Sequence, residues 1–452
     1  MKIAFIGGGS VQWTPMLVAD MAFCQTLAGA ELALHDIDTG ALDLLTRASE
    51  RIVKQVGGSL SIAATADRAD ALRGATFVIL CVSIGGLAAM RGDLTIPERY
   101  GVYQAVGDTV GPGGLARGLR FIPFAVRVAR EMERLCPDAW LLNLTNPMTT
   151  ICRGVARATS VRAIGLCHEV DIFRRDHLAR VLNVPPQAIT LEVAGINHLP
   201  AILHLRLGGD DGMARLRTWL AEHGPFAFLH EHHPDPSQDT FKDRLAVKLS
   251  LFEALGVLFG AGDRHVAEFF PGFLTDAAGR GARYGVLLTT IEHRAAIAQR
   301  RRVWIEGFVN GEPANFEPSH EQLVPVMAAL AGGPPGRFVV NVPNVGQIDN
   351  LPRDAVVECL AEIDGLGVHP QAVGALPHPA HAAIAPHVAR QELIVEAALT
   401  GRREPARAAM ALDPLIRDPA SAGSLLDELL AANASFAAPE GAGDRTPSTG
   451  GA

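Results

Sequence analysis

The chain has 452 residues, of which 48% are hydrophobic, so it can bury a core in two or three domain-sized units. A formal net charge of −8 and an aromatic content of 6% exclude the basic, aromatic-interleaved surface that binds nucleic acid. The longest apolar stretch, from residue 77 to residue 90, is interrupted by Ser83, Gly85 and Gly86 and is too short for a membrane span. Because the first residues read as a strand and not as a signal peptide, we expect a cytoplasmic protein that binds no membrane.

The first 190 residues alternate short β-branched runs with helical stretches. The predicted strands are residues 2–7, 31–37, 75–82, 139–146 and 161–167, with helices at 15–27, 39–55 and 122–135. Strands that alternate with helices form a parallel sheet covered on both faces. The sequence therefore predicts an α/β fold, whose N-terminal domain (1–190) is a doubly wound sheet of Rossmann type, similar to lactate and malate dehydrogenases.

The pattern changes after the turn residues VPPQ at 184–187. Residues 191–207 indicate strand segments around a loop, and residues 241–259 and 291–302 indicate helices. We predict a C-terminal α+β substrate domain over residues 191–438. Residues 439–452 are of low complexity, and we expect a disordered tail there.

A glycine-rich turn follows the first predicted strand and precedes a helix. Its residues are Gly7, Gly8, Gly9 and Ser10, and glycines at this point let the backbone approach a pyrophosphate at a helix N-terminus. Asp36 ends the second strand, where an acid can bind both ribose hydroxyls and repel a 2′-phosphate. The alternative for the glycine-rich turn is an ordinary strand-to-helix turn, and the alternative for Asp36 is a solvated acid at a strand end. Together the two features favour an NAD site over an NADP site.

The chain resembles glycoside hydrolase family 4 over most of its length, up to about residue 435. The segments that carry the resemblance are GGGSVQWTP (7–15), YGVYQAVGDTVGPGGLARGLR (100–120), NLTNPM (143–148), GLCHEV (165–170), GINHL (195–199), VPNVGQIDNLP (342–352) and DPL (413–415). Members of this family are glycosidases that depend on NAD and a divalent metal. Within the family, GLCHEV and GDRHVAEFFPG (262–272) are most similar to the α-galacturonidase branch, and the α-galactosidase branch comes next.

The resemblance implies a metal site at Cys167 and His198, where the family binds Mn²⁺. Taken alone, each residue is more simply a core thiol or a structural histidine. Two protein ligands leave positions open on the ion for sugar hydroxyls and water. A thiolate and an imidazole are not the oxygen ligands that Mn²⁺ prefers, so the metal's identity rests on the resemblance.

The reaction expected from such a site is the hydrolysis of an α-galacturonide or a related α-uronide without net oxidation. The nicotinamide oxidises C3 of the sugar, which acidifies the C2 proton, and the metal stabilises the resulting enediolate. The C1 substituent is then eliminated, water adds and C3 is reduced again. Asn146 is predicted to bind a sugar hydroxyl, with an Asn-Pro turn as the alternative, and the loop from Gly107 to Gly114, with Asp108, to close over the sugar.

The proton-transfer residues depart from the family pattern. Many members use a tyrosine as the C2 base, in the stretch where this chain has Phe269 and Phe270. The nearest titratable groups are Asp263 and His265, of which His265 is favoured because a histidine titrates near neutral pH. His168 is predicted either to protonate the leaving group or to orient Cys167. Arg264 is predicted to pair with the uronide carboxylate, and an ion pair with Glu268 is its alternative.

Two rival functions share parts of this pattern. A plain NAD-dependent dehydrogenase of a sugar acid or hydroxy acid shares the nucleotide site but has no need of Cys167 and His198 as metal ligands. A non-catalytic, NAD-responsive protein predicts no turnover at all. We further expect a homodimer or homotetramer, with a small sugar or uronide as the substrate.

Overall fold

The computed structural model describes residues 1–436, and the predicted disordered tail lies outside the described residues. Six parallel strands form the N-terminal part of the sheet in the order β3-β2-β1-β4-β5-β6. This order is the one found in dinucleotide-binding folds, and the order in which strands are added across the sheet reverses between β1 and β4. The strands are β1 (Lys2–Ile6), β2 (Glu31–His35), β3 (Ser61–Thr65), β4 (Phe77–Leu80), β5 (Trp140–Asn143) and β6 (Arg162–Leu166).

Alternate residues of β1 face two different helical layers. Ile3 and Phe5 pack with the residues of α1 and α2, and Ala4 and Ile6 pack with those of α3 and α5. This alternation is what a strand covered on both faces requires. The helices of this half are α1 (Thr14–Phe23), α2 (Thr39–Val56), α3 (Arg68–Leu72), α4 (Gly86–Glu98), α5 (Gly111–Leu135) and α6 (Met148–Ala158).

Strand β3 was not predicted, because it lies at the edge of the sheet and exposes three of its five residues. An edge strand of this kind carries no long apolar run that would mark it in the sequence. Strand β6 pairs on its far side with the antiparallel strand β11, so the sheet continues into the second half of the chain and reaches 13 strands. The added strands are β7 (Ile189–Ile196), β8 (Leu199–Leu207), β9 (Asp210–Asp211), β10 (Leu258–Phe259), β11 (Gly336–Pro343), β12 (Val356–Asp364) and β13 (Gly367–Pro370).

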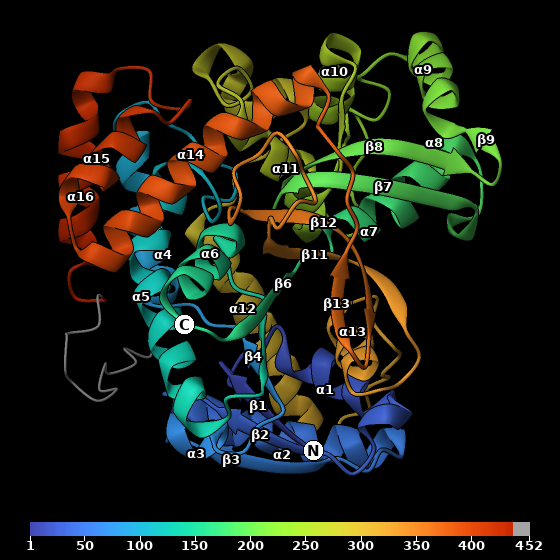
Figure 1. Cartoon of the computed structure of the whole chain (residues 1–452), viewed down its shortest axis with the longest axis vertical. Helices are drawn as coiled ribbons and strands as arrows, with labels where there is room; N and C mark the ends of the chain where they lie inside the picture. The colour runs from blue at the N-terminus through green and yellow to red at the C-terminus, as the bar shows by residue number, and fades with distance from the viewer. Residues whose placement is uncertain (437–452) are drawn as a thin grey trace.

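The second half adds antiparallel strands and helices, so the predicted α/β fold with a C-terminal α+β part is confirmed. Figure 1 shows the parallel strands and α1 to α3 at one end of the molecule and the β7–β8 hairpin at the other. The helices are α7 (Glu169–Ile172), α8 (Ala179–Leu182), α9 (Gly212–His223), α10 (Ala246–Leu255), α11 (Asp263–Val266), α12 (Ile291–Val309), α13 (Leu323–Leu330), α14 (His378–Thr400), α15 (Arg403–Ala411) and α16 (Ala422–Asn433).

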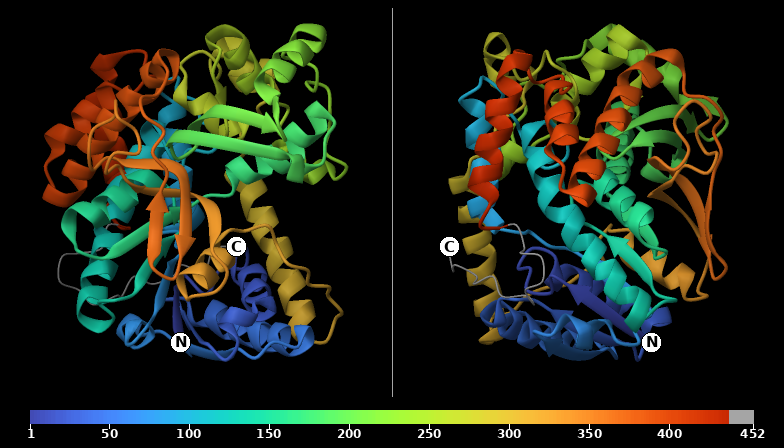
Figure 2. Two further views of the ribbon diagram at one scale, coloured as in Figure 1. Left: turned by 45° about the vertical axis from the view of Figure 1, so that its right-hand side comes forward. Right: turned by 60° about the vertical axis from the view of Figure 1, so that its left-hand side comes forward.

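Helices from the second half return to the first half. Helices α14 to α16 pack against α4, α5 and α6, as both views of Figure 2 show, and α12 packs against α2 and α4. The domain boundary predicted at residue 190 falls on the second residue of β7, and the division into two units remains a prediction. Among residues 1–436, no helix is both long and apolar enough to cross a membrane.

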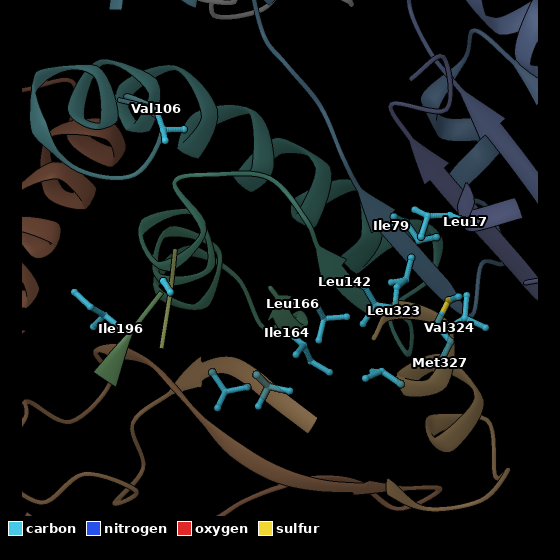
Figure 3. Close-up of a cluster of buried hydrophobic side chains, with 14 of the residues drawn as sticks. Leu17, Ile79, Val106, Leu142, Ile164, Leu166, Ile196, Leu323, Val324 and Met327 are labelled. Atoms are coloured by element: carbon cyan, nitrogen blue, oxygen red, sulfur yellow. The ribbon is translucent and has the colours of Figure 1, made fainter. Parts of the chain in front are cut away.

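One buried cluster joins the two halves beneath the carboxyl ends of the parallel strands. Figure 3 shows Leu17 and Ile79 from the N-terminal part close to Leu323, Val324 and Met327 of α13. Truncating a fully buried leucine in such a cluster typically costs about 2–5 kcal/mol, so the strand ends above it are held firmly. Side chains that follow these strands therefore have fixed positions.

Candidate active site

A cavity of about 510 Å³ opens at the carboxyl ends of β5 and β6 and faces the turn between β7 and β8. Parallel sheets bind their ligands at this edge. The cavity brings together eight of the side chains that the sequence singled out: Asp108, Asn146, Cys167, His168, His198, Asp263, Arg264 and His265. It also includes residues that the sequence analysis did not assign to the site, among them Trp13, Glu169, Arg294 and Glu321.

The glycine-rich turn forms a cradle beside this cavity. Gly7 has a φ of +97°, and a Cβ atom on it would lie 1.9 Å from the carbonyl oxygen of Cys81. A Cβ atom on Gly9 would lie 2.7 Å from an Asp36 carboxylate oxygen, which accepts a 3.0 Å hydrogen bond from the Gly9 amide. Ser10, in the turn before α1, accepts a hydrogen bond from the amide of Trp13, the residue that precedes the helix. The geometry of the turn, the helix N-terminus and the strand-end acid fits a dinucleotide, and their role as its ligands stays a prediction.

His198 sits in the tight turn between β7 and β8 with a φ of +66° and is almost fully buried. Its Nδ1 lies 2.8 Å from the hydroxyl of Thr109, which in turn donates to Asp108. This arrangement assigns the ring proton to Nδ1 and leaves the lone pair of Nε2 available to a metal. Burial and the neighbouring His265 lower the pKa of His198 to about 3, so the ring is neutral, as a metal ligand must be.

The ligand atoms of Asp108, His198 and His265 all lie within 4.8 Å of one another. Three groups at this spacing can meet a single cation. Burial alone would raise the pKa of the Asp108 carboxyl, but His265, Arg117 and the hydrogen bond from Thr109 outweigh burial, lower this pKa and keep Asp108 ionised. The sequence singled out His198 as a ligand but did not predict Asp108 in this role.

Cys167 follows β6 and lines the same cavity as His198. Burial raises the pKa of its thiol well above the usual value, and the nearby carboxyls of Glu358 and Glu169 add to this effect. Hydrogen bonds from the backbone of Glu169 and the side chain of Asn197 oppose it. A thiol in such a place is a thiolate only when a cation is beside it. Asp108 and His198 lie in a group whose geometry fits a divalent metal, whereas Cys167 lines the same cavity outside that group, so its role as a ligand stays a prediction.

His168 is held from two sides. Its Nδ1 lies 2.7 Å from a carboxylate oxygen of Glu321, and its ring stacks on Trp13 with the centroids 6.1 Å apart. Burial lowers the pKa of His168, but the hydrogen bond to Glu321 and the charges of Glu321 and Glu169 outweigh burial and raise it. Glu321 comes from the irregular segment before α13, where no sequence pattern marked it.

His265 lies at the centre of the site, on the short helix α11. Its Nδ1 is 4.0 Å from an oxygen of Asp108, and its Nε2 is 4.0 Å from an oxygen of Glu169. Nδ1 is buried without a hydrogen-bond partner among the described residues. Burial opposes the ionisation of Glu169, but His265, His168 and the hydrogen bond from the Gly262 amide outweigh burial and lower the pKa of its carboxyl to about 2.

Asp263 lines the cavity, but both of its oxygens are already engaged. They accept hydrogen bonds of 2.9 and 3.1 Å from the amides of Val247 and Lys248 in the first turn of α10. Burial and the neighbouring Asp243 raise the pKa of this carboxyl. The geometry therefore suits a residue that holds the start of α10 better than one that transfers a proton.

Arg264 and Arg294 bring two buried guanidinium groups to one wall of the cavity. Arg264 donates to the carbonyl oxygen of Ala105 at 2.8 Å and lies under the ring of Phe241, while its Nε has no partner among the described residues. The alternative ion pair of Arg264 with Glu268 does not form in the described structure. Arg294, on α12, leaves both Nε and Nη2 buried without a partner. No pattern in the sequence marked it, because α12 carries three other exposed or half-exposed arginines, Arg300, Arg301 and Arg302.

Asn146 lies opposite this wall. Its side-chain amide donates to Asp108 over 3.2 Å, and its side-chain oxygen is buried without a partner among the described residues, so it is free to accept from a sugar hydroxyl. The glycine-rich segment beside it differs from the prediction. Gly111 to Gly114 form the buried first turn of α5 and are not part of a loop.

The family models match both parts of the chain. Residues 2–184 match the model of family 4 glycosyl hydrolases, and residues 193–416 match the C-terminal domain of the same family. An alpha-galacturonidase of Thermoanaerobacterium saccharolyticum is 35% identical over 92% of both chains. An alpha-galactosidase of Bacillus subtilis is 32% identical over 91% of this chain and 93% of its own length.

Solved structures agree with this match. A putative glucosidase, LplD, from Bacillus subtilis is 32% identical, with a TM-score of 0.87 over 95% of this chain and 99% of its own. A 6-phospho-alpha-glucosidase from gut microorganisms, solved in complex with NAD and Mn²⁺, has a TM-score of 0.82 over 96% of this chain and 98% of its own, at 23% identity. The second likeness concerns the fold alone.

Proposed function

This chain belongs to family 4 of the glycosyl hydrolases, and we propose that it hydrolyses an α-galacturonide with NAD and Mn²⁺ as cofactors. Relatives named alpha-galacturonidase are 32–35% identical to it and those named alpha-galactosidase are 30–32% identical, so overall similarity favours the galacturonide. The observation that carries the proposal is the unpaired guanidinium of Arg294 in the cavity wall. Family membership does not support the rival dehydrogenase or a non-catalytic protein.

The cofactors would be held by the two sites described above. The cradle of Gly7, Gly8, Gly9 and Ser10, with Asp36, would hold NAD, which supplies a hydride acceptor and donor for C3 of the sugar when bound. His198 and Asp108, whose ligand atoms lie close together, would hold the divalent cation with Cys167 from the same cavity, and the cation supplies a Lewis acid for the sugar oxygens when bound.

In this proposal His265 removes the proton from C2. The Nδ1 atom of its ring is buried and has no hydrogen-bond partner among the described residues. The ring also lies against His198, which would bind the metal that holds the sugar. Asp108 and Glu169 are ionised on either side of it and stabilise the imidazolium that forms. His265 also belongs, with Asp108 and His198, to the group of three side chains that can bind one cation. Substitution of His265 therefore tests whether it acts as the base or as a metal ligand.

His168 is proposed to protonate the oxygen of the leaving group. The carboxylate of Glu321 holds Nδ1 and favours the protonated ring, while Trp13 fixes the plane of the ring at the cavity wall. A carboxylate behind a histidine stabilises its charged form in the same way as in other acid–base sites. Asn146, with an unpaired side-chain oxygen, is proposed to bind a sugar hydroxyl.

The uronide carboxylate would lie between Arg264 and Arg294. A buried guanidinium with two unpaired N–H groups is costly unless an anion meets it. A neutral hexose offers only a hydroxymethyl group at this place, whereas a carboxylate can accept both hydrogen bonds of Arg294. The site therefore supports a uronide better than a galactoside.

The experiment compares 4-nitrophenyl α-D-galacturonide and α-D-galactoside with NAD⁺ and Mn²⁺ present. The wild type should prefer the uronide by at least about a hundredfold in kcat/KM, since an unpaired buried charge typically costs about 3–5 kcal/mol. Arg294→Met and Arg264→Met should each collapse that ratio by weakening the uronide. Arg300→Met, an exposed arginine on the same helix, is the control. Equal wild-type rates on both sugars would return the α-galactosidase alternative to first place.

Assembly and location are part of the same proposal. We propose a homodimer or homotetramer, because α12 exposes Val303 and Trp304, which are 55% and 44% accessible. We also propose a cytoplasmic location, since all six cysteines are free, as is usual in reducing compartments. Light scattering after gel filtration, with Trp304→Glu as the test variant, checks the oligomer.

A further inference from the structure

Glu268 is a buried acid that the reaction proposed above does not use. It lies on the single turn η5 (Ala267–Phe269) directly after α11 and is 1% exposed. One of its oxygens accepts hydrogen bonds of 2.6 and 2.9 Å from the amides of Val106 and Gly107. The other oxygen is buried without a partner among the described residues. An orphan acceptor in such a place requires an explanation.

The charged groups around Glu268 come from three elements. Arg264 on α11 and Arg294 on α12 attract its negative charge, and Asp108, on the loop that Glu268 holds, repels it. On the remaining side, α14 directs His387 to the carbonyl oxygen of Phe269, and its Arg390 is paired with Asp413. Glu268 therefore stands behind the same two guanidinium groups that would meet the sugar carboxylate.

The charge of Glu268 decides what these arginines can do. Uncharged, it leaves two buried cations with unpaired N–H groups facing the cavity. Ionised, it places an anion within electrostatic reach of both, where charges interact strongly because water is excluded. Burial and Asp108 raise the pKa of this carboxyl to about 8, although the two amides and Arg264 act in the opposite direction.

We propose that Glu268 determines specificity: when uncharged it leaves Arg264 and Arg294 free for a sugar carboxylate, and when ionised it competes with that carboxylate for them. This inference rests on the proposed uronide function. It predicts that preference for a charged sugar is lost as pH rises, while the binding of a neutral sugar is unaffected by the change at Glu268.

The test measures the dissociation constants of D-galacturonate and D-galactose by calorimetry, with the enzyme loaded with NAD⁺ and Mn²⁺, at pH 7 and pH 9. For one competing group with a pKa of about 8, the preference of the wild type for galacturonate should fall roughly tenfold over this interval. Glu268→Gln keeps an oxygen for the amides of Val106 and Gly107, and its preference should change less than about twofold. The binding of galactose serves as the reference, because any effect of pH on the metal or the nucleotide changes the binding of both sugars and drops out of their ratio.

Glu358→Gln is the matched control, because Glu358 is also a 1% exposed carboxyl that accepts hydrogen bonds from two amide groups, but it lies among Asn197 and Asn341. This variant should keep the tenfold fall of the wild type. A wild type that binds both sugars equally at pH 7 contradicts the uronide function itself. A wild type that prefers galacturonate, with the same pH dependence in Glu268→Gln, overturns only the role of Glu268. Melting temperatures of both variants show whether they are folded.

Discussion

His265 lies against His198 with the two ring centroids 3.7 Å apart and the planes inclined by 30°. Two imidazoles this close do not both carry a proton on each nitrogen, because like charges disfavour one another at short range. The pKa of His198 is accordingly lowered to about 3, by burial first and His265 second. His198 thus stays a neutral ligand while the neighbouring ring is available to accept a proton.

His265→Gln should lower kcat by about a hundredfold to ten-thousandfold, the usual contribution of a general base. The Mn²⁺ dissociation constant, followed by electron paramagnetic resonance of free Mn²⁺, should stay within a few-fold of the wild type. Deuterium at C2 of the substrate should show a larger isotope effect in the variant, since proton removal becomes slower. A variant that instead loses most of its Mn²⁺ affinity would show that His265 is a metal ligand.

Cys167→Ser and His198→Ala should each remove most of the activity and weaken Mn²⁺ binding. Binding of NAD⁺, measured by fluorescence titration, should remain close to wild type, because the glycine cradle lies apart from these side chains. The wild type should also be more active in a reducing buffer, since a thiolate ligand is open to oxidation. If both variants turn over at the wild-type rate in the presence of a chelator, the ligand assignment is wrong.

Asp36→Ala should weaken NAD⁺ binding by about tenfold to a hundredfold, which corresponds to the loss of hydrogen bonds to a charged group. The expected reason is the loss of an acceptor for the ribose hydroxyls at the end of β2. Calorimetric titration with NAD⁺ and NADP⁺ measures it, and discrimination against NADP⁺ should decrease in parallel. Asp43→Ala, on the exposed side of α2, is the control and should bind NAD⁺ as the wild type does.

His387 makes the folded protein sensitive to acid. It is buried, with Nε2 against the carbonyl oxygen of Phe269 and Nδ1 against the guanidinium of Arg390, both at 3.2 Å. Burial and Arg390 lower its pKa to about 3. The unfolded chain takes up this proton near pH 6.5 and the folded chain does not, so stability is retained above pH 6.5 and lost as pH falls toward 3.

The free energy of unfolding should fall by about 1.4 kcal/mol per pH unit for each histidine of this kind. His387→Gln should therefore be destabilised at pH 7 yet show a smaller further loss between pH 6 and pH 4.5 than the wild type. Urea unfolding at several pH values measures the slope of the free energy of unfolding against pH. The exposed His204→Gln variant should keep the wild-type slope, and an unchanged slope in His387→Gln would rule His387 out as its source.

The sequence by itself determined the parts of this protein that depend on neighbours along the chain. The strand, glycine turn and helix at residues 2–23, and the acid at the end of the second strand, are local patterns, and the structure reproduces them in β1, α1 and β2. The recurring motifs of the family selected Cys167, His168, His198, His265 and Asn146, which all reach one cavity. Local patterns and short motifs survive folding because their geometry is set within a few residues.

Only the tertiary structure decided which side chains from distant segments meet. Arg294 and Glu321 have nothing in their own surroundings along the chain to mark them, yet α12 and the segment before α13 bring them to the site. Glu268 lies in a marked motif, but only the fold shows that it holds the loop at Val106 and Gly107. The same holds for Asp263, whose engagement with the start of α10 is visible only once α10 and α11 are packed together. Charge, burial and hydrogen-bond partners are properties of the folded environment, so the chemistry of these residues could not be assigned before the fold was known.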